Sequence, residues 1–268
     1  MTASGPKRLE PSLHAKIWGS TELEPWYPRS QDLIGEVWFP PPADLPILVK
    51  FLFTSARLSV QVHPEDDYAR RHENSAGKTE MWYILRAGPG AEIALGFREL
   101  ITRERLREAS LSGEIEELLR WIPVKAGETY FTPAGTVHAI GPDLALCEIQ
   151  QLSDVTYRLY DYGRPRPLHL DKAAEVANLG PHPGVSVPEP DGVLVRCPYF
   201  VTESLRVERE VAYELHAAHL LVCLKGCGTL AGEPFRAGQV WHVPEGASFD
   251  LKPDAPAHFL RTSIPPAA

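Results

Sequence analysis

Short apolar runs follow one another along most of this chain. Examples are ILVKFLF (residues 47–53), EMWYIL (80–85), LLVCLKG (220–226) and QVWHVP (239–244). Turn-forming residues separate these runs, because 26 prolines and 20 glycines are spread over 268 residues. Short strands bounded by Pro and Gly are typical of β-sandwiches and β-barrels. We therefore expect a mainly β protein.

Two segments depart from this pattern. Residues 100–121, LITRERLREASLSGEIEELLRW, have helical spacing of their apolar positions and predict one or two short helices inserted between strands. Residues 179–192, LGPHPGVSVPEPDG, are rich in Pro and Gly and lie between two strand-rich halves. We expect a linker there, with a first domain at residues 1–178 and a second domain at residues 193–268.

A weak internal repeat spans the linker. GETYFTPAGTVH (127–138) and GQVWHVPEGASF (238–249) share the pattern Gly-x5-Pro-x-Gly, but Phe249 stands where the first copy has His138. Repetition of this kind indicates two copies of one β unit. The pattern with its final His resembles the second conserved motif of the cupin (jelly-roll) barrels, in which that His is a metal ligand. The resemblance implies two cupin-like barrels, of which the second lacks metal ligands.

A candidate metal site lies in the first half. In LSVQVHPEDDYA (58–69), Gln61 and His63 are two residues apart on a predicted strand and so share one face. Taken alone, this pair fits an exposed strand face. With Glu80 on the next strand and His138 at cupin spacing, two imidazoles, an amide oxygen and a carboxylate suit a borderline divalent metal. We expect one zinc per chain, with a position left for water or substrate.

Charge and cysteine content narrow the classes of partner and compartment. The formal net charge of −8 argues against a nucleic-acid or anionic-membrane partner. The first residues lack the apolar core of a signal peptide, and no run approaches a membrane span, so we expect a cytoplasmic protein. We expect buried free thiols at the four cysteines, which form no CxxC pair: Cys147, Cys197, Cys223 and Cys227.

Six runs stand out along the chain: KIWGS (16–20), IGEVW (34–38), LSVQVHPEDDYA (58–69), GKTEMWYIL (77–85), PAGTVHAIG (133–141) and EIQQLSDVTYRLYDYGR (148–164). Together, and in this order, they resemble the type I mannose-6-phosphate isomerases in their short bacterial form. They cover roughly the first two thirds of the chain, and the second domain resembles that family only loosely.

This resemblance implies a zinc-dependent interconversion of mannose 6-phosphate and fructose 6-phosphate through a cis-enediolate. It puts the zinc ligands at the four side chains named above and the catalytic arginine at Arg158. It also puts Glu148 in the same pocket, where it is our candidate base. Two ammonium groups and a hydroxyl can bind a phosphate dianion, and the resemblance puts these donors at Lys50, Ser59 and Lys78.

Other interpretations stay open from the sequence. The substrate could be a different phosphorylated aldose. Long members of the isomerase family carry a large helical domain between the Glu ligand and the second His, and this chain lacks it, since only 57 residues separate Glu80 from His138. A metal-dependent cupin oxygenase or a non-enzymatic sugar-binding cupin would also use the barrel. Arg158 could instead pair with Asp154 or Asp161 to hold the barrel rim. The oligomeric state is not predicted.

Overall fold

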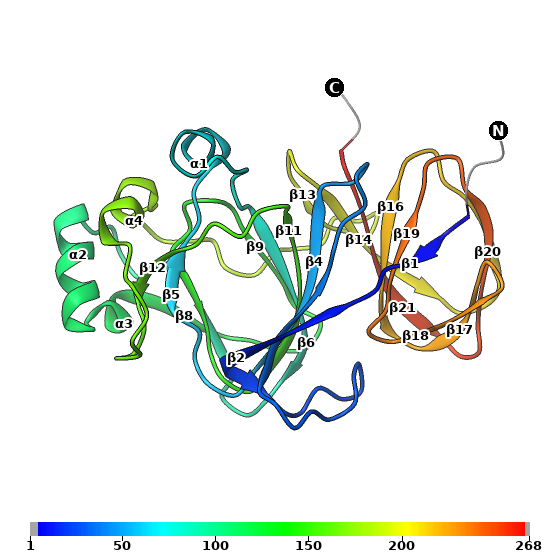
Figure 1. Cartoon of the computed structure of the whole chain (residues 1–268), viewed down its shortest axis with the longest axis horizontal. Coiled ribbons are helices and arrows are strands. Elements are labelled where there is room, and N and C mark those ends of the chain that lie inside the picture. The colour runs from blue at the N-terminus through cyan, green and yellow to red at the C-terminus, as the bar shows by residue number, and fades with distance from the viewer. Residues whose placement is uncertain (1–4, 266–268) are drawn as a thin grey trace.

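The computed structural model describes residues 5–265, and over that range the mainly β prediction is confirmed. Its strands form four sheets, arranged as two units side by side, with most of the helices at the outer end of the first unit (Figure 1). No helix in the described part of the chain is long and apolar enough to cross a membrane.

The first unit consists of two facing antiparallel sheets. The six-stranded sheet has the order β2 (Ser12–Ser20), β3 (Ile34–Phe39), β4 (Ile47–Thr54), β11 (Leu144–Gln151), β6 (Glu80–Ala87) and β9 (Thr129–Thr132). The five-stranded sheet has the order β12 (Tyr157–Tyr160), β5 (Val60–Val62), β10 (His138–Ile140), β7 (Glu92–Phe97) and β8 (Leu119–Pro123).

The second unit also has two sheets. The six-stranded one has the order β1 (Lys7–Arg8), β19 (Val240–Val243), β16 (His219–Lys225), β21 (Ala257–Ser263), β14 (Val201–Val207) and β13 (Val193–Arg196). The four-stranded one has the order β15 (Val211–Glu214), β20 (Ser248–Pro253), β17 (Cys227–Leu230) and β18 (Glu233–Arg236). The domain boundaries stay a prediction, and one pairing crosses them, because β1 pairs with β19 of the second half.

Strand β4 shows why some runs are apolar on both faces. Val49, Phe51 and Phe53 lie in a core that also contains side chains of the second unit. Lys50 and Leu52 point the other way, into the space between the two sheets of the first unit. A strand covered on both faces reads as a continuous apolar run. Lys50, which is only 1% exposed, therefore needs polar partners inside the unit.

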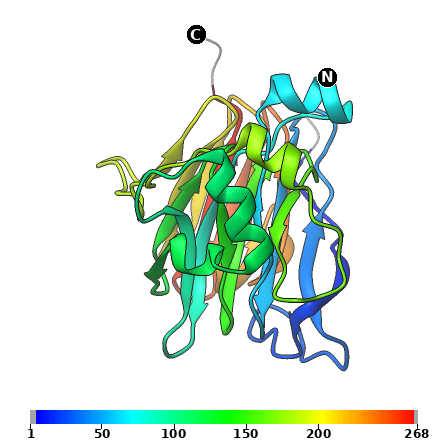
Figure 2. The same cartoon turned by 90° about the vertical axis from the view of Figure 1, so that its left-hand side faces the viewer.

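Helices α2 (Arg103–Ser112), α3 (Ile115–Leu118) and α4 (Leu170–Val176) cover the outer face of the five-stranded sheet (Figure 2). The predicted helical segment contains α2 (Arg103–Ser112) and α3 (Ile115–Leu118), but residues 119–121 belong to strand β8. Two further helices were not predicted, α1 (Asp66–Glu73) and α4 (Leu170–Val176). In α1, acidic residues in the first turn and basic residues in the last turn interact favourably with the helix dipole, which stabilises this short helix.

Packing under these helices decides which way β5 faces. Val60 and Val62 are fully buried in the same core cluster as residues of α2 and α4. Because side chains alternate along a strand, Gln61 must point to the opposite side, into the first unit. The alternation predicted for this strand therefore places Gln61 inside the first unit.

Backbone conformation supports the internal repeat. Gly127 and Gly238 have φ of 93° and 86°, and Gly135 and Gly246 have φ of 85° and 73°. These left-handed values favour glycine at equivalent positions of both copies. Phe249, at the position of His138, is buried in the core of the second unit.

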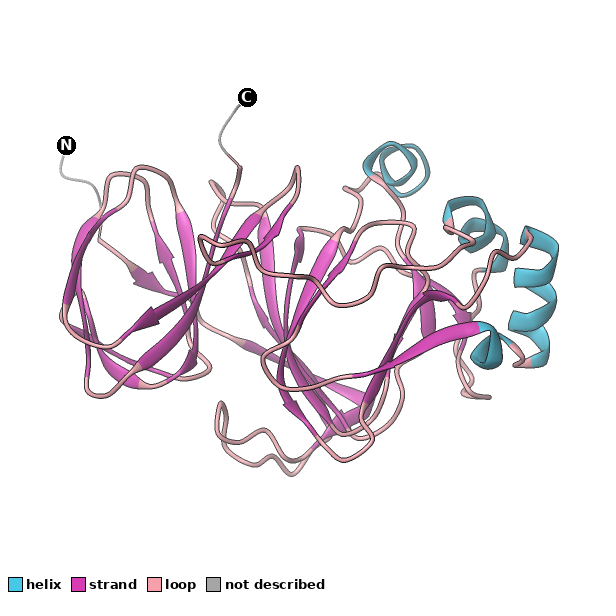
Figure 3. Cartoon of the chain, turned by 180° about the vertical axis from the view of Figure 1, so that it is seen from behind, coloured by secondary structure: helices cyan, strands magenta, loops and turns pink. Residues whose placement is uncertain are grey.

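The segment 179–192 contains no helix and no named strand, and it runs as a long loop along the first unit toward the second (Figure 3). His182 in this loop donates from Nε2 to the Phe131 carbonyl, and Phe131 N donates to Ser186 Oγ. The loop is thus bound to the edge strand β9 of the first unit.

The four cysteines are all free thiols. Cys147, Cys197 and Cys223 are buried as predicted, but the prediction was wrong for Cys227, which is exposed. Its sulfur lies 3.5 Å from Asp254 Oδ2 near the surface. An apolar neighbourhood in the sequence did not ensure burial, because burial alternates along β17 and Cys227 lies on its exposed face.

Candidate active site

Three predicted metal ligands meet inside the first unit. His63 follows β5, Glu80 begins β6 on the facing sheet, and His138 begins β10. Glu80 Oε2 lies 3.6 Å from His63 Nε2, and Glu80 Oε1 lies 3.5 Å from His138 Nε2. One ligand atom from each residue lies within 4.8 Å of the others, and all three side chains are buried.

Backbone carbonyls orient both imidazoles. His63 Nδ1 donates to Val155 O at 2.8 Å, and His138 Nδ1 donates to Thr136 O at 2.9 Å. A carbonyl can only accept, so both rings carry the proton on Nδ1 and direct the lone pair of Nε2 toward Glu80. Carbonyl or carboxylate partners of this kind commonly fix metal-ligating histidines.

Gln61 lies beside this group, directly across the strand pair from His138. Its Nε2 is 3.2 Å from His138 Nε2, and its Oε1 accepts from Ser59 Oγ at 3.2 Å. The expected ligand was the amide oxygen. Turning the amide by 180° exchanges the two atoms, and amide orientation is set by the surrounding hydrogen bonds.

The three ligands fit a divalent cation because two of the buried atoms that face the centre lack a hydrogen-bond donor. Within residues 5–265, His63 Nε2 and Glu80 Oε1 make no hydrogen bond, and Glu80 Oε2 has the ammonium group of Lys78 at 3.3 Å. Burial, and next the nearby Glu148, raise the pKa of Glu80 to about 8. Burial lowers the pKa of His138 to about 4 and that of His63 well below its usual value. Neutral imidazoles can bind a cation, and a bound cation stabilises a carboxylate whose ionised form is disfavoured by burial.

A second buried group joins the metal ligands to the cavity. Lys50 Nζ lies 3.4 Å from Glu148 Oε1, and Lys78 Nζ lies 3.3 Å from Glu80 Oε2 and 4.0 Å from Glu148 Oε1. Burial alone would raise the pKa of Glu148, but Lys78 and Lys50 lower it on balance. The same carboxylates raise the pKa of Lys78, although burial opposes them. Glu148 is therefore a buried carboxylate that stays ionised near neutral pH.

A polar cavity of about 290 Å³ opens next to these residues. Its wall includes all five residues predicted for catalysis or phosphate binding: Lys50, Ser59, Lys78, Glu148 and Arg158. Gln61 also lines it, which connects the cavity to the candidate metal group. Sequence reasoning missed further polar lining residues: Lys16, Glu36, Asp154, Thr156 and Arg166. All five except Arg166 fall within or beside the quoted motifs, which was the available signal.

Arg158 lies one strand away from the metal group. It pairs across β12 and β5 with Gln61, which in turn pairs with His138 on β10. Its Nη1 donates to Pro167 O at 3.0 Å, and its buried Nε has no partner among the described residues. Asp161, the suggested structural partner of Arg158, instead binds Arg166 through two hydrogen bonds of 2.6 Å.

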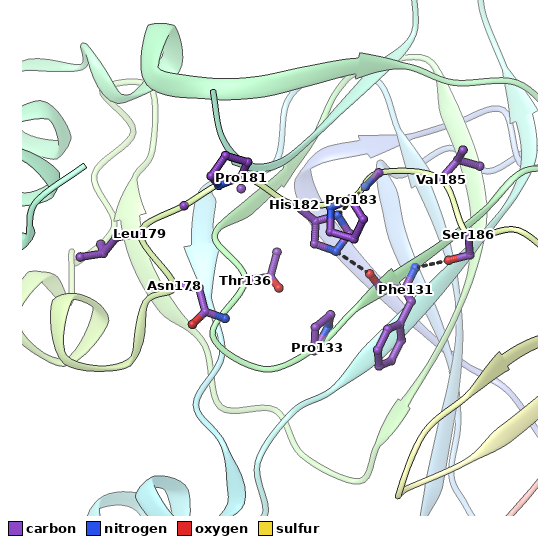
Figure 4. Close-up of a pocket in the computed structure, with 13 residues that line it drawn as sticks. Phe131, Pro133, Thr136, Asn178, Leu179, Pro181, His182, Pro183, Val185 and Ser186 are labelled. Atoms are coloured by element: carbon purple, nitrogen blue, oxygen red, sulfur yellow. Dashed lines mark hydrogen bonds between the residues drawn. The ribbon is translucent and has the colours of Figure 1, made fainter. Parts of the chain in front are cut away.

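A larger cavity, of about 630 Å³, lies on another side of the first unit (Figure 4). Its wall is formed by the loop that contains His182 and by β9 and its following turn, including Phe131 and Pro133. It contains none of the nine predicted site residues. Two of its polar side chains, His182 and Ser186, form the bonds that attach the loop, and none of the described residues that line it has a charged side chain, so the polar cavity is the better candidate for catalysis.

Known proteins are similar to this chain over most of its length. No protein-family model matches it. A mannose-6-phosphate isomerase of Streptococcus mutans is 34% identical over 266 aligned positions, covering 81% of this chain and 84% of the relative. A probable mannose-6-phosphate isomerase of Bacillus subtilis is 33% identical over 310 positions, covering 97% of this chain and 96% of the relative. The crystal structure of a Bacillus subtilis mannose 6-phosphate isomerase superposes with a TM-score of 0.85 at 28% identity, covering 97% and 100% of the two chains.

The fold and the buried group of candidate metal ligands define a cupin-like enzyme. The chain belongs to the mannose-6-phosphate isomerase family, which confirms the resemblance drawn from the six sequence motifs.

Proposed function

We propose that this chain is a zinc-dependent aldose–ketose isomerase that interconverts mannose 6-phosphate and fructose 6-phosphate through a cis-enediolate. The observation that supports it most is the polar cavity, where the candidate metal ligands and an ionised buried carboxylate adjoin a cationic wall. The relatives are named as mannose-6-phosphate isomerases, which supports mannose 6-phosphate as a substrate.

His63, Glu80 and His138 would hold the zinc, and Gln61 would join them once its amide is turned. His63 Nε2 and Glu80 Oε1, buried atoms without a hydrogen-bond donor among the described residues, support this set. When bound, zinc supplies a Lewis acid next to the oxygens on which negative charge develops.

Glu148 is the candidate for moving the proton between C1 and C2 of the open-chain sugar. Two buried ammonium groups keep it as a carboxylate, which is the form that a base requires. Arg158 would stabilise the enediolate, because its guanidinium stays charged at any working pH and its Nε lacks a partner.

A phosphorylated ligand is favoured by the charge of the cavity wall. Five basic side chains and three acidic ones line it, although the whole chain has a net charge of −8. An excess of positive charge in an acidic protein suits an anionic substrate better than a neutral sugar or dioxygen. Lys50, Ser59 and Lys78 are the proposed phosphate donors.

The test is a coupled assay of fructose 6-phosphate formation from mannose 6-phosphate, with metal content measured on the same preparation. We expect close to one zinc per chain, and loss of activity on chelation. His138→Ala should lower metal occupancy without unfolding the protein, whereas His258→Ala in the second unit should leave metal occupancy unchanged.

Other outcomes identify the alternatives. Turnover restricted to another sugar phosphate in a substrate panel would redefine the substrate. Oxygen consumption with bound iron or copper would indicate an oxygenase, and sugar binding without turnover would indicate a binding protein.

A further inference from the structure

Two adjacent glutamines at the end of β11 lie among the segments that carry the candidate metal ligands. Gln150 is fully buried and Gln151 is 7% exposed. Neither lines the polar cavity, and the proposed reaction uses neither. Buried amides are retained where their hydrogen bonds fix a structure, so their partners indicate what they fix.

Gln151 holds the residue between Lys78 and Glu80. Its Oε1 accepts from Thr79 N at 2.8 Å, and its own backbone N donates to Thr79 O at 3.1 Å. Both backbone polar groups of Thr79 therefore bond to one residue. The peptide units that join Thr79 to Lys78 and to Glu80 cannot tilt without breaking one of these bonds.

The other end of the same amide reaches the segment after His63. Gln151 Nε2 donates to Asp66 Oδ1 at 2.9 Å, and that oxygen also accepts from Gly77 N at 2.8 Å. The two segments touch here, since a Cβ on Gly77 would lie 2.5 Å from Asp66 N. Lys78 N also donates to Pro64 O at 3.0 Å. One side chain thus links the strand end of His63 to the strand start of Glu80.

Neighbouring bonds extend the link to the remaining ligand and to the orientation of His63. Thr79 Oγ1 accepts from Ala134 N at 3.2 Å, in the turn that leads to His138. Gln150 Nε2 donates to Ser153 O at 2.5 Å, in the turn whose Val155 carbonyl orients the His63 ring.

We propose that Gln151 is a positioning residue for the metal group, because its side-chain amide sets the separation of His63 and Glu80. This inference rests on the proposed function, since it assigns a role within the same site. Gln151 touches neither the ligand atoms nor the cavity, and it acts through Thr79 and Asp66.

Reversing the polarity of one hydrogen bond tests the proposal. Gln151→Glu keeps the size and the acceptor for Thr79 N, but it places a carboxylate oxygen against Asp66. We expect the zinc dissociation constant, measured by competition with a chromophoric chelator, to rise about 10- to 100-fold. Gln151→Met, which removes both side-chain bonds without adding charge, should have the same effect.

Adding Asp66→Asn to Gln151→Glu should restore zinc affinity. The new amide can donate to the carboxylate at position 151, while its oxygen still accepts from Gly77 N. Asp66→Asn alone should change zinc affinity little, because its oxygen can accept from both original donors. A double variant as weak as Gln151→Glu alone would overturn the proposal.

A remote variant separates positioning from general stability. Thr202→Val removes the buried hydroxyl pair of Thr202 and Thr262 in the second unit, which are 3.0 Å apart. It should lower the melting temperature and leave the zinc dissociation constant unchanged. The same pattern in both Gln151 variants would show that Gln151 only stabilises the fold. If the parent protein itself neither binds zinc nor isomerises, the proposed function fails; if it does both, only the role of Gln151 is at issue.

Discussion

The indole of Trp82 donates a hydrogen bond of 3.1 Å to Glu148 Oε2, and both side chains are buried. The two residues are cross-strand neighbours on β6 and β11, and Lys50 lies 3.4 Å from the other carboxylate oxygen of Glu148. Lys50 is itself 4.2 Å from the centre of the Trp38 ring. Glu148 is thus held between an indole and an ammonium group, in a fixed orientation beside the cavity.

Trp82→Phe keeps a buried aromatic ring and removes that donor. The pKa of Glu148 should rise, because a group that stabilises its charged form is lost. With Glu148 as the base, the acidic limb of the kcat profile should move to higher pH. The free energy of unfolding should fall by about 1–3 kcal/mol, the cost of leaving a buried acceptor without its partner.

Trp121→Phe is a matched control for that substitution. It also loses an indole hydrogen bond, here to the Glu116 carbonyl, but Trp121 does not line the polar cavity. Its kcat profile should match that of the parent. An unshifted acidic limb in Trp82→Phe would show that Trp82 does not tune the base.

The metal-free protein should lose stability as pH rises from about 6.5 to 8. Glu80 has a pKa of about 8 in the folded state, above the usual value of about 4.5, so the folded state keeps a proton that the unfolded chain has released. Stability from this group is therefore lost as pH rises toward 8. His138, with a pKa of about 4 when folded, acts oppositely, but its contribution is complete above about pH 6.5. Thermal melts of the chelated protein across this range measure the fall.

Two comparisons test the origin of that fall. Saturating zinc should remove it, because a bound cation stabilises the Glu80 carboxylate. Glu80→Gln should remove it without any metal, since the amide does not titrate. A slope that persists in Glu80→Gln would assign the pH dependence to another group.

Lys78→Ala tests the proposed phosphate contact. It should weaken binding of mannose 6-phosphate by about 1.5–3 kcal/mol, the value of a charge-assisted hydrogen bond. Lys172→Ala, which removes an exposed lysine paired with Glu73, should have no effect on binding. Unphosphorylated mannose should be a very poor substrate of the parent. Equal rates on mannose and its 6-phosphate would remove the phosphate assignment altogether.

The clustering of the candidate metal ligands was predictable because its signals are local. Gln61 and His63 share a face through the two-residue period of a strand, and the turn before His138 carries fixed Gly and Pro positions. The contacts of Glu148 were not predictable in this way. Its neighbours Lys50 and Trp82 depend on the register of three strands that are distant in the sequence.

The helices and the exposure of Cys227 also show which features have a local sequence signal and which depend on tertiary contacts. The segment that contains α2 and α3 has helical spacing, whereas α1 begins within a run that was interpreted only for its candidate ligands. Cys227 is exposed because it lies on the uncovered face of β17, and local composition does not specify which face of a strand is covered. The bridging role of Gln151 likewise needs the tertiary contact with Asp66.

Arg158→Met separates transition-state stabilisation from substrate binding. If the guanidinium meets charge that develops only in the enediolate, its loss should lower kcat by about 100- to 1000-fold, with a much smaller rise in KM. Metal content should stay normal, since Arg158 contacts the group only through the neighbouring strand. The melting temperature should change little, because Arg158 forms no ion pair within residues 5–265, and its one side-chain bond is to a backbone carbonyl.

Arg164→Met is the matched control, because we expect it to lower stability and leave kcat unchanged. Arg164 pairs with the buried carboxylate of Asp161 at 2.7 Å and donates to Arg57 O, but it does not line the polar cavity. Its removal should lower the melting temperature, because the buried Asp161 carboxylate loses one of its two arginine partners, while kcat stays close to that of the parent. Measuring zinc content, melting temperature and kcat on the same preparations distinguishes the two arginines. An Arg158→Met protein that melts early yet keeps kcat within a few fold of the parent would make Arg158 a structural residue of the rim.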